Sequence, residues 1–162
     1  MAERAEGDEV GRRERRRVDA SEVSWAVREL QRAQAEYDRH LAHRLDLRTL
    51  DYAAMSYLME AQHPPGPVEL AGRLGISTGS GTELADRLER AGHLHRRPAV
   101  GDRRRVVLEP ADGSVARMID ELSPLLTDIE EVASTFTDDE RAAIVAYLVA
   151  VAERTRAHAT EG

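Results

Sequence analysis

The sequence predicts a mainly α-helical fold with one small β-hairpin, and two observations support it. Hydrophobic residues make up 41% of the 162-residue chain but aromatic residues only 4%, so Ala, Leu and Val supply most of the apolar surface, as is usual in helical proteins. Apolar side chains recur at three- and four-residue spacing along most of the chain, and the pattern becomes strand-like after Gly92. A chain of this length is expected to form a single domain.

The N-terminal segments differ in apolar content. Residues 1–17 mix arginine with acid and contain almost no apolar side chain, so we expect a disordered arm; a basic arm that touches phosphate is the alternative interpretation. From Asp19 to about Leu41 the apolar residues follow helical spacing. A second helix is expected to begin with Asp46 as its N-cap and to end before His63.

Helix start and stop signals mark out two short helices in the next segment. Proline at the first helical position, glycine after a helix and serine as N-cap are typical of such ends. In chain order these signals are Gly66, Pro67, Gly75, Ser77 and Gly92. The second helix has an apolar inner face at Leu84, Leu88 and Ala91, so the pair predicts a helix-turn-helix.

A hairpin and two further helices are expected after Gly92. The segments HLHRRP and RRVVLEP flank an arginine-rich turn with Gly-Asp at its tip, which is typical of a two-stranded hairpin. Ala111 to about Thr135 follows helical spacing, with a break or kink expected near Pro124. TDDE at 137–140 is a capping box that opens the last helix.

These elements predict a winged helix-turn-helix flanked by helices that form a dimer. We assign 46–110 to the winged helix-turn-helix, and 18–45 and 111–162 to dimerisation helices within one domain, 18–162. The flanking helices carry apolar stripes that a monomer would struggle to cover. Their members are Val23, Val27, Leu30, Ile144, Leu148 and Val151; an intramolecular core is the alternative explanation for them.

Composition excludes several classes of chemistry. The chain has no cysteine and all 23 basic residues are arginine, which excludes disulfides, thiolate sites, lysine Schiff bases and the Walker phosphate loop. We therefore expect no enzyme activity and no cofactor. The pairs His40 with His43 and His93 with His95 have spacings that a metal accepts, but neither cysteine nor a fixed acidic ligand accompanies them, so we expect no metal site.

Hydropathy and charge indicate the cellular location of the chain and the kind of partner that it binds. An apolar run of the roughly 18 residues that a membrane span needs is absent, as is the apolar core of a signal peptide, which predicts a cytoplasmic protein. The net charge is −7, yet residues 67–110 carry eight arginines against six acids, whereas 111–162 carry four against eleven. The middle segment is therefore the candidate for binding nucleic acid.

A helix-turn-helix followed by an arginine-tipped hairpin predicts a domain that binds double-stranded DNA. The second helix can enter the major groove, and wing arginines can reach phosphates or the minor groove. Hydroxyls at the positive end of that helix suit phosphate oxygens, and glycines beside them permit close approach of the backbone. The candidate contacts are Ser77, Thr78, Ser80, Thr82, Arg87, Arg103, Arg104 and Arg105.

Two of these arginines have further expected partners. Asp102 is expected to orient a wing arginine through a charge-assisted hydrogen bond. Arg87 has Glu83 four residues before it, so a surface ion pair is the alternative interpretation of that arginine.

The stretch ELAGRLGISTGSGTELADRLERAGHLHRRPAVGDRRRVVLEPADG resembles the winged-helix core of MarR-family transcription regulators. The matching pieces are Glu-Leu-Ala, Leu-Glu-Arg-Ala-Gly with the Arg-Arg that follows, and Asp-Arg-Arg with its Val-Leu-Glu-Pro return; together they cover about 45–115. The resemblance implies that Ser77, Thr78, Ser80 and Thr82 begin the recognition helix. It also implies that Asp102 and Arg104 are the wing's Asp-x-Arg, with Arg104 in the minor groove.

The chain departs from the family pattern at two places. Gly81 stands where an aliphatic residue is usual, and Glu83 stands where a basic or neutral residue is usual. We expect these two positions to make the chain an atypical reader of DNA.

The resemblance also implies a function. It implies a homodimer on a pseudo-palindromic operator, usually a repressor, that a small aromatic or anionic molecule releases by binding between the dimerisation helices and the winged helix. Candidates for that pocket are Tyr37, His40, Tyr52 and Met55, which an ordinary core explains equally well. The alternative function is a protein-interaction module that has lost specific DNA binding, which Glu83 and the acidic C-terminal third favour.

Overall fold

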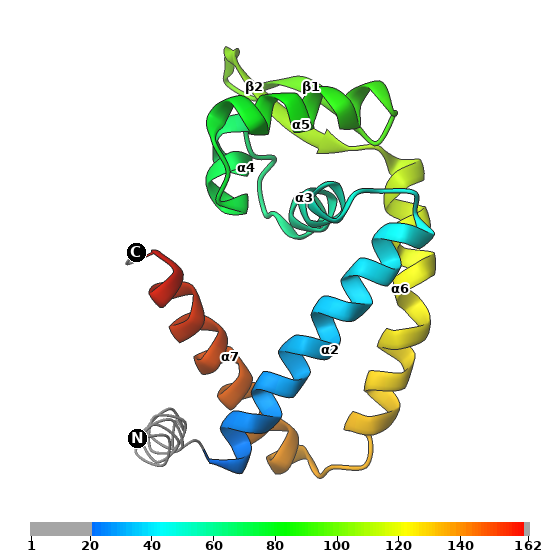
Figure 1. The fold of residues 1–162 in the computed structure, drawn as a ribbon, viewed down its shortest axis with the longest axis vertical. Helices are drawn as coiled ribbons and strands as arrows, with labels where there is room; N and C mark the ends of the chain where they lie inside the picture. The colour runs from blue at the N-terminus through cyan, green and yellow to red at the C-terminus, as the bar shows by residue number, and fades with distance from the viewer. Residues whose placement is uncertain (1–20, 161–162) are drawn as a thin grey trace, which may run out of the picture.

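The computed structural model describes residues 21–160, and the predicted arm at 1–17 lies outside them. Figure 1 shows a compact lobe of short helices and a hairpin, from which long helices extend. The described elements are α2 (Glu22–Arg44), α3 (Thr49–Glu60), α4 (Pro67–Leu74), α5 (Thr78–Arg90), β1 (Leu94–Ala99), β2 (Asp102–Pro110), α6 (Asp112–Ala133) and α7 (Asp138–Thr160). This order confirms the predicted mainly helical fold with one hairpin.

Local signals end the helices where the sequence indicates. Gly75 follows α4 with a φ of 66°, the left-handed conformation that glycine adopts without steric cost. The side chain of Ser77 accepts a hydrogen bond from the amide of Ser80 at 3.2 Å and caps α5. At the start of α7 the amide of Thr137 donates to Glu140 at 2.8 Å, and the amide of Glu140 donates back at 3.3 Å. The predicted capping box is confirmed.

The structure corrects two predictions about where the helices begin and break. Asp46 does not cap α3; it has a φ of 58° and belongs to the turn that ends α2, where the amide of Leu47 donates to the carbonyl of Ala42 at 2.8 Å. Aspartate tolerates this left-handed conformation, so the same residue type serves either end of a helix. Of the break or kink predicted near Pro124, the break is wrong, because α6 runs unbroken to Ala133; the proline removes one amide donor from a helix of 22 residues.

The hydrophobic core lies in the compact lobe. The two strands pair antiparallel, with a register shift between Pro98 and Ala99 near the tip. The amide of Leu108 donates to the carbonyl of Pro65 at 2.8 Å and ties the hairpin to the segment before α4. Fully buried side chains come from α2 through α6 and include Leu41, Met55, Leu70, Leu84, Leu88, Leu94, Leu108 and Met118.

Gly81 of α5 is packed against α4. A Cβ added to Gly81 would lie 2.5 Å from the Cβ of Ala71 and 3.1 Å from the carbonyl oxygen of Pro67. The expectation that this glycine keeps the helix start small for DNA is therefore wrong, since Gly81 is buried against α4. Gly79 differs, because it is exposed and its added Cβ would meet nothing nearer than the Ser77 hydroxyl at 3.9 Å.

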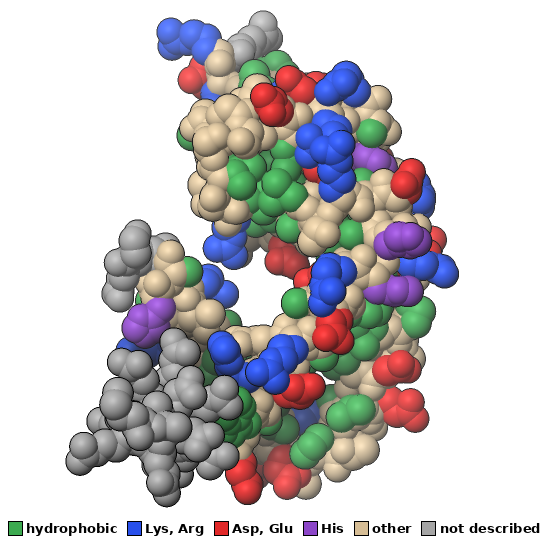
Figure 2. Space-filling model, in the orientation of Figure 1, with side chains coloured by type: hydrophobic (Ala, Val, Ile, Leu, Met, Phe, Trp, Pro, Cys, Tyr) green, Lys and Arg blue, Asp and Glu red, His purple; other side chains and the backbone are tan. Residues whose placement is uncertain are grey.

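The long helices α2 and α6 each contribute one end to this core, through Leu41 and Met118, and extend beyond it. Arg44 of α2 donates two hydrogen bonds, of 3.0 and 3.1 Å, to the carboxylate of Glu121 on α6. Tyr37 donates to the carbonyl of Glu121 at 3.2 Å. In the space-filling view the molecule is hollowed between the compact lobe and the long helices (Figure 2). Within residues 21–160, every helix is too short or too polar to cross a membrane.

Large apolar side chains remain exposed on these long helices. They are Val23, Trp25, Leu30, Ile119, Leu126, Ile129, Val132, Phe136, Ile144, Val145, Tyr147, Leu148 and Val149, of which Phe136 lies in the turn before α7. A monomer ordinarily exposes single, scattered apolar side chains, whereas here many are exposed on adjoining elements.

Replacing Gly81 with alanine should destabilise the fold. The clash with Ala71 should lower the free energy of unfolding by about 1–3 kcal/mol, which outweighs the gain in helix propensity of up to about 1 kcal/mol. Gly79→Ala is the matched control and should leave stability unchanged or raise it by up to about 1 kcal/mol. Urea denaturation of both variants measures the difference, and equal stabilities would contradict the packing role of Gly81.

Candidate nucleic-acid interface

The start of α5 forms a small, polar and exposed surface. Ser77, Thr78, Ser80 and Thr82 are all exposed. The hydroxyls of Ser77 and Ser80 lie 2.9 Å apart, and the hydroxyl of Thr82 donates to the carbonyl of Thr78 at 3.1 Å. This helix end carries a positive partial charge, so it can accept an anionic group such as a phosphate.

The opposite face of α5 holds the helix in place. Gly81, Leu84, Ala85 and Leu88 are buried, which leaves the exposed hydroxyls on the outer face. Glu83 is also exposed there. The outer face of α5 therefore combines neutral hydroxyl groups with one carboxylate near the helix start.

Arg87 faces the interior of the lobe. Its guanidinium donates to both carboxylate oxygens of Asp51 on α3, at 3.0 and 2.5 Å. These hydrogen bonds raise the pKa of Arg87 above its usual value, although burial opposes the shift. Asp51 is only 4% exposed, so the pair joins α5 to the core, and the surface pair with Glu83 is not what holds Arg87.

This pair was missed by sequence reasoning, although a signal for it exists. Asp51 precedes the buried residues Ala54, Met55 and Leu58 by three, four and seven positions. It therefore stands on the apolar face of α3, where a carboxylate requires a partner. The position of Asp51 indicates that a cationic partner is needed, but it does not identify Arg87, which lies 36 residues further along the chain.

A second arginine that sequence reasoning missed joins α5 to the wing. Arg96 of β1 lies 2.6 Å from the carboxylate of Asp86 and 2.5 Å from that of Glu89. Its amide also donates to Glu89, at 3.2 Å. The hydrogen bond from the Arg96 side chain holds the pKa of Glu89 below its usual range. The bridge therefore joins the hairpin to α5.

The tip of the hairpin presents Arg104. The amide of Arg104 donates to the carboxylate of Asp102 at 3.0 Å, and its side chain is 96% exposed, 3.7 Å from that carboxylate. Arg105 lies 3.6 Å from Glu69 of α4. The side chain of Arg103 lies outside the described part of the structure. Asp102 is therefore positioned to shape the turn that projects Arg104.

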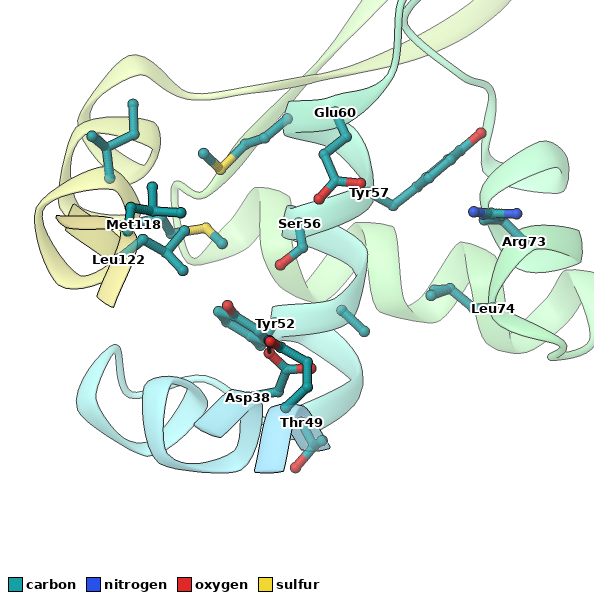
Figure 3. Close-up of a pocket in the computed structure, with 15 residues that line it drawn as sticks. Asp38, Thr49, Tyr52, Ser56, Tyr57, Glu60, Arg73, Leu74, Met118 and Leu122 are labelled. Carbon is teal, nitrogen blue, oxygen red and sulfur yellow. Dashed lines mark hydrogen bonds between the residues drawn. The ribbon is translucent and has the colours of Figure 1, made fainter. Parts of the chain in front are cut away.

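A cavity of about 700 Å³ lies between α2, α3, α4 and α6 (Figure 3). Of the four predicted pocket residues, Tyr52 lines it. Met55 is fully buried in the core, and Tyr37 stacks with His40 at a ring-centroid distance of 6.4 Å. Burial is the main cause of a raised pKa at Tyr52, to which the negative charge of Asp38 adds.

Comparison with known proteins identifies what this chain resembles. The family model described as the MarR family matches residues 57–106. The uncharacterized HTH-type transcriptional regulator YcgE of Bacillus subtilis (strain 168) is 36% identical over 110 residues, which span 66% of this chain and 69% of YcgE.

Solved structures share the fold. A MarR family protein from Bacillus stearothermophilus has a TM-score of 0.66 at 18% identity, over 83% of this chain and 94% of that one. A mutant of MepR from S. aureus, bound to an oligodeoxyribonucleotide, has a TM-score of 0.53 at 16% identity, over 84% of this chain and 99% of that one.

Removing the charge of Asp51 should weaken the fold. Asp51→Asn leaves the Arg87 guanidinium without its ionic partner and should lower the free energy of unfolding by about 2 kcal/mol, less than for a fully buried pair because Arg87 is partly exposed. Asp46→Asn, at an exposed aspartate, is the control and should change stability by less than about 0.5 kcal/mol. If thermal and urea denaturation show the two variants to be alike, the ion pair does not anchor α5.

Proposed function

Because this chain belongs to the MarR family, we propose that it is a transcription regulator that binds double-stranded DNA as a homodimer. The observation that carries the proposal is the pairing of an exposed, hydroxyl-rich start of α5 with a wing whose Arg104 is 96% exposed. A helix start of this kind suits the major groove, and an extended arginine suits the narrow minor groove. The oligonucleotide bound to the MepR mutant, which shares this fold, supports the assignment.

The proposed contacts divide by chemistry. Ser77, Thr78, Ser80 and Thr82 meet phosphates and base edges, since small hydroxyls allow the helix backbone to lie close to DNA. Arg104 enters the minor groove, with Asp102 holding the turn behind it, and Arg103 and Arg105 add phosphate contacts. Arg87 acts indirectly, because its hydrogen bonds to Asp51 position α5. The winged helix at 46–110 is thus the DNA-reading unit.

The exposed apolar side chains of α2, α6 and α7 support a homodimer. A second copy that packs against these helices would bury the surface that the chain alone leaves open. Two winged helices related by a two-fold axis read two half-sites, so the operator is expected to be pseudo-palindromic.

We further propose that the regulator is a repressor released by a small molecule. The cavity touches α2 and α6 on one side and α3 and α4 on the other. A ligand bound there would favour one spacing of these helices over another and so change how α5 is presented to DNA.

A winged helix that binds a protein instead of DNA is the second candidate function. The exposed carboxylate of Glu83 on the outer face of α5 favours it, because that charge repels phosphates. DNA binding with steep salt dependence is expected of the first function and not of the second.

Replacing Arg104 should weaken DNA binding. We expect Arg104→Ala to lose at least about 1 kcal/mol of binding free energy on DNA from upstream of the chain's own gene, because one wing contact is removed. Arg39→Ala, which removes an exposed arginine from α2, is the control and should bind like the wild type. Fluorescence anisotropy titrations at several salt concentrations measure both.

Two outcomes would change these proposals. Equal affinities of Arg104→Ala and the wild type would remove the wing from DNA recognition. Absence of salt-dependent binding by the wild type would favour the protein-interaction module.

A charge on the apolar face of α7 should split the dimer. Leu148→Glu would place a carboxylate in the proposed interface and should weaken dimerisation by at least about 2 kcal/mol. Val68→Glu changes an exposed aliphatic residue on α4 and should leave the dimer intact. Sedimentation equilibrium measures both, and a wild-type chain that is monomeric at micromolar concentration would refute the dimer.

A further inference from the structure

We propose that the cavity between α2, α3, α4 and α6 binds a hydrophobic organic cation, and that Asp38 and Glu60 select for its positive charge. The inference rests on the effector role proposed above and specifies the chemistry of that effector. The family resemblance implies an aromatic or anionic effector; the inference keeps the aromatic character and replaces the negative charge with a positive one.

The size and walls of the cavity suit a drug-sized organic molecule. Its volume is about 700 Å³, within the roughly 300–1,000 Å³ of small-molecule sites. The phenol rings of Tyr52 and Tyr57 supply aromatic surface. The aliphatic walls come from α3, α4 and α6 and comprise Met59, Leu74, Met118, Ile119, Leu122 and Leu126. These walls favour an apolar body but do not distinguish its charge.

Two carboxylates from different helices supply the charge selection. Asp38 of α2 is half-buried and accepts a hydrogen bond from the amide of Gln34 at 2.9 Å, and Glu60 ends α3 at the exposed edge of the cavity. Both are close enough to Tyr52 for their negative charges to add to the rise in its pKa that burial causes. The same negative potential that disfavours a phenolate there disfavours any anion and stabilises a cation.

The arginine of the cavity does not cancel this potential. The guanidinium of Arg73 lies 5.5 Å from the centroid of the Tyr57 ring. Figure 3 shows Arg73 across Tyr57 from Asp38 and Tyr52, at the α4 end. The lining thus holds two carboxylates against one guanidinium, and that guanidinium is stacked on a ring. The part of the cavity around Tyr52 is therefore acidic and aromatic.

An acidic aromatic site is the environment that a lipophilic ammonium or phosphonium ion prefers. The face of a tyrosine ring attracts a cation, and the attraction grows when water is excluded. Asp38 is held by Gln34, so little side-chain freedom is lost on binding. An anion of the same shape would bury the same apolar area and meet repulsion.

The position of the site also links it to α5. Tyr52 lines the cavity, and its neighbour Asp51 binds Arg87 of α5. A ligand that moves this turn of α3 therefore acts on the ion pair that positions the recognition helix.

Tetraphenylphosphonium and tetraphenylborate provide the test, because they have nearly the same size and shape and opposite charge. Isothermal titration calorimetry of the full chain without DNA should show tetraphenylphosphonium binding at least tenfold more tightly. Adsorption to the exposed apolar helices can also favour the cation, because the chain carries a net charge of −7, but it would not change when a carboxylate of the cavity is removed.

Variants assign the preference to the cavity. Asp38→Asn and Glu60→Gln should each weaken tetraphenylphosphonium binding roughly threefold to fivefold, as expected for partly exposed charge pairs. Glu36→Gln is the matched control, because Glu36 is exposed on the same helix as Asp38 and does not line the cavity. It should bind the cation like the wild type.

Each outcome separates this inference from the proposed function. Equal affinities for the two ions, tighter binding of tetraphenylborate, no binding of either, or retained cation affinity in both cavity variants would overturn the cation site, even if the wild type binds its operator. Selective cation binding by a chain that does not bind DNA would overturn the proposed function and leave the site. A selective cation that leaves operator affinity unchanged would overturn its role as effector.

Discussion

The close contact between α4 and α5 at Gly81 sets the rotation of α5 about its own axis, and the candidate interface depends on that rotation. With Gly81 against Ala71, Leu84, Ala85 and Leu88 follow on the same face and enter the core. The outer face then carries Ser80, Thr82 and Glu83. A side chain at position 81 would push the helices apart and move every outward residue with them.

Arginine ion pairs complete the positioning of α5 and reduce the free positive charge of the domain. Arg87 is bound by Asp51, and Arg96 is bound by Asp86 and Glu89. The planar guanidinium makes such two-point contacts, which suits a chain whose basic residues are all arginine. The local excess of arginine at 67–110 therefore overstates the charge offered to DNA. Helix-end hydroxyls and Arg104 carry correspondingly more of the proposed contact.

Structural features that depend on a few neighbouring residues could be predicted from the sequence, whereas contacts between distant segments could not. The Ser77 cap, the Gly75 helix end and the TDDE capping box each depend on neighbours within four positions, and each was predicted correctly. The role of Gly81 was misinterpreted, because a glycine is required there by the contact with Ala71, which lies on another helix. The prediction that Asp46 caps α3 was wrong although it depended on a local signal, since aspartate suits both a helix start and the left-handed turn after a helix.

The same limit explains the partial prediction of the cavity. Tyr52 and Met55 were both candidates for the pocket, with an ordinary core as the alternative, and the sequence cannot distinguish a residue that meets other side chains from one that meets a cavity. Met55 enters the core, whereas Tyr52 borders the open space beside Asp38. Because α3 also carries Asp51, one helix contacts the cavity, the core and the anchor of α5. The proposed ligand would therefore influence the recognition helix through rigid packing, without a flexible linker between the two sites.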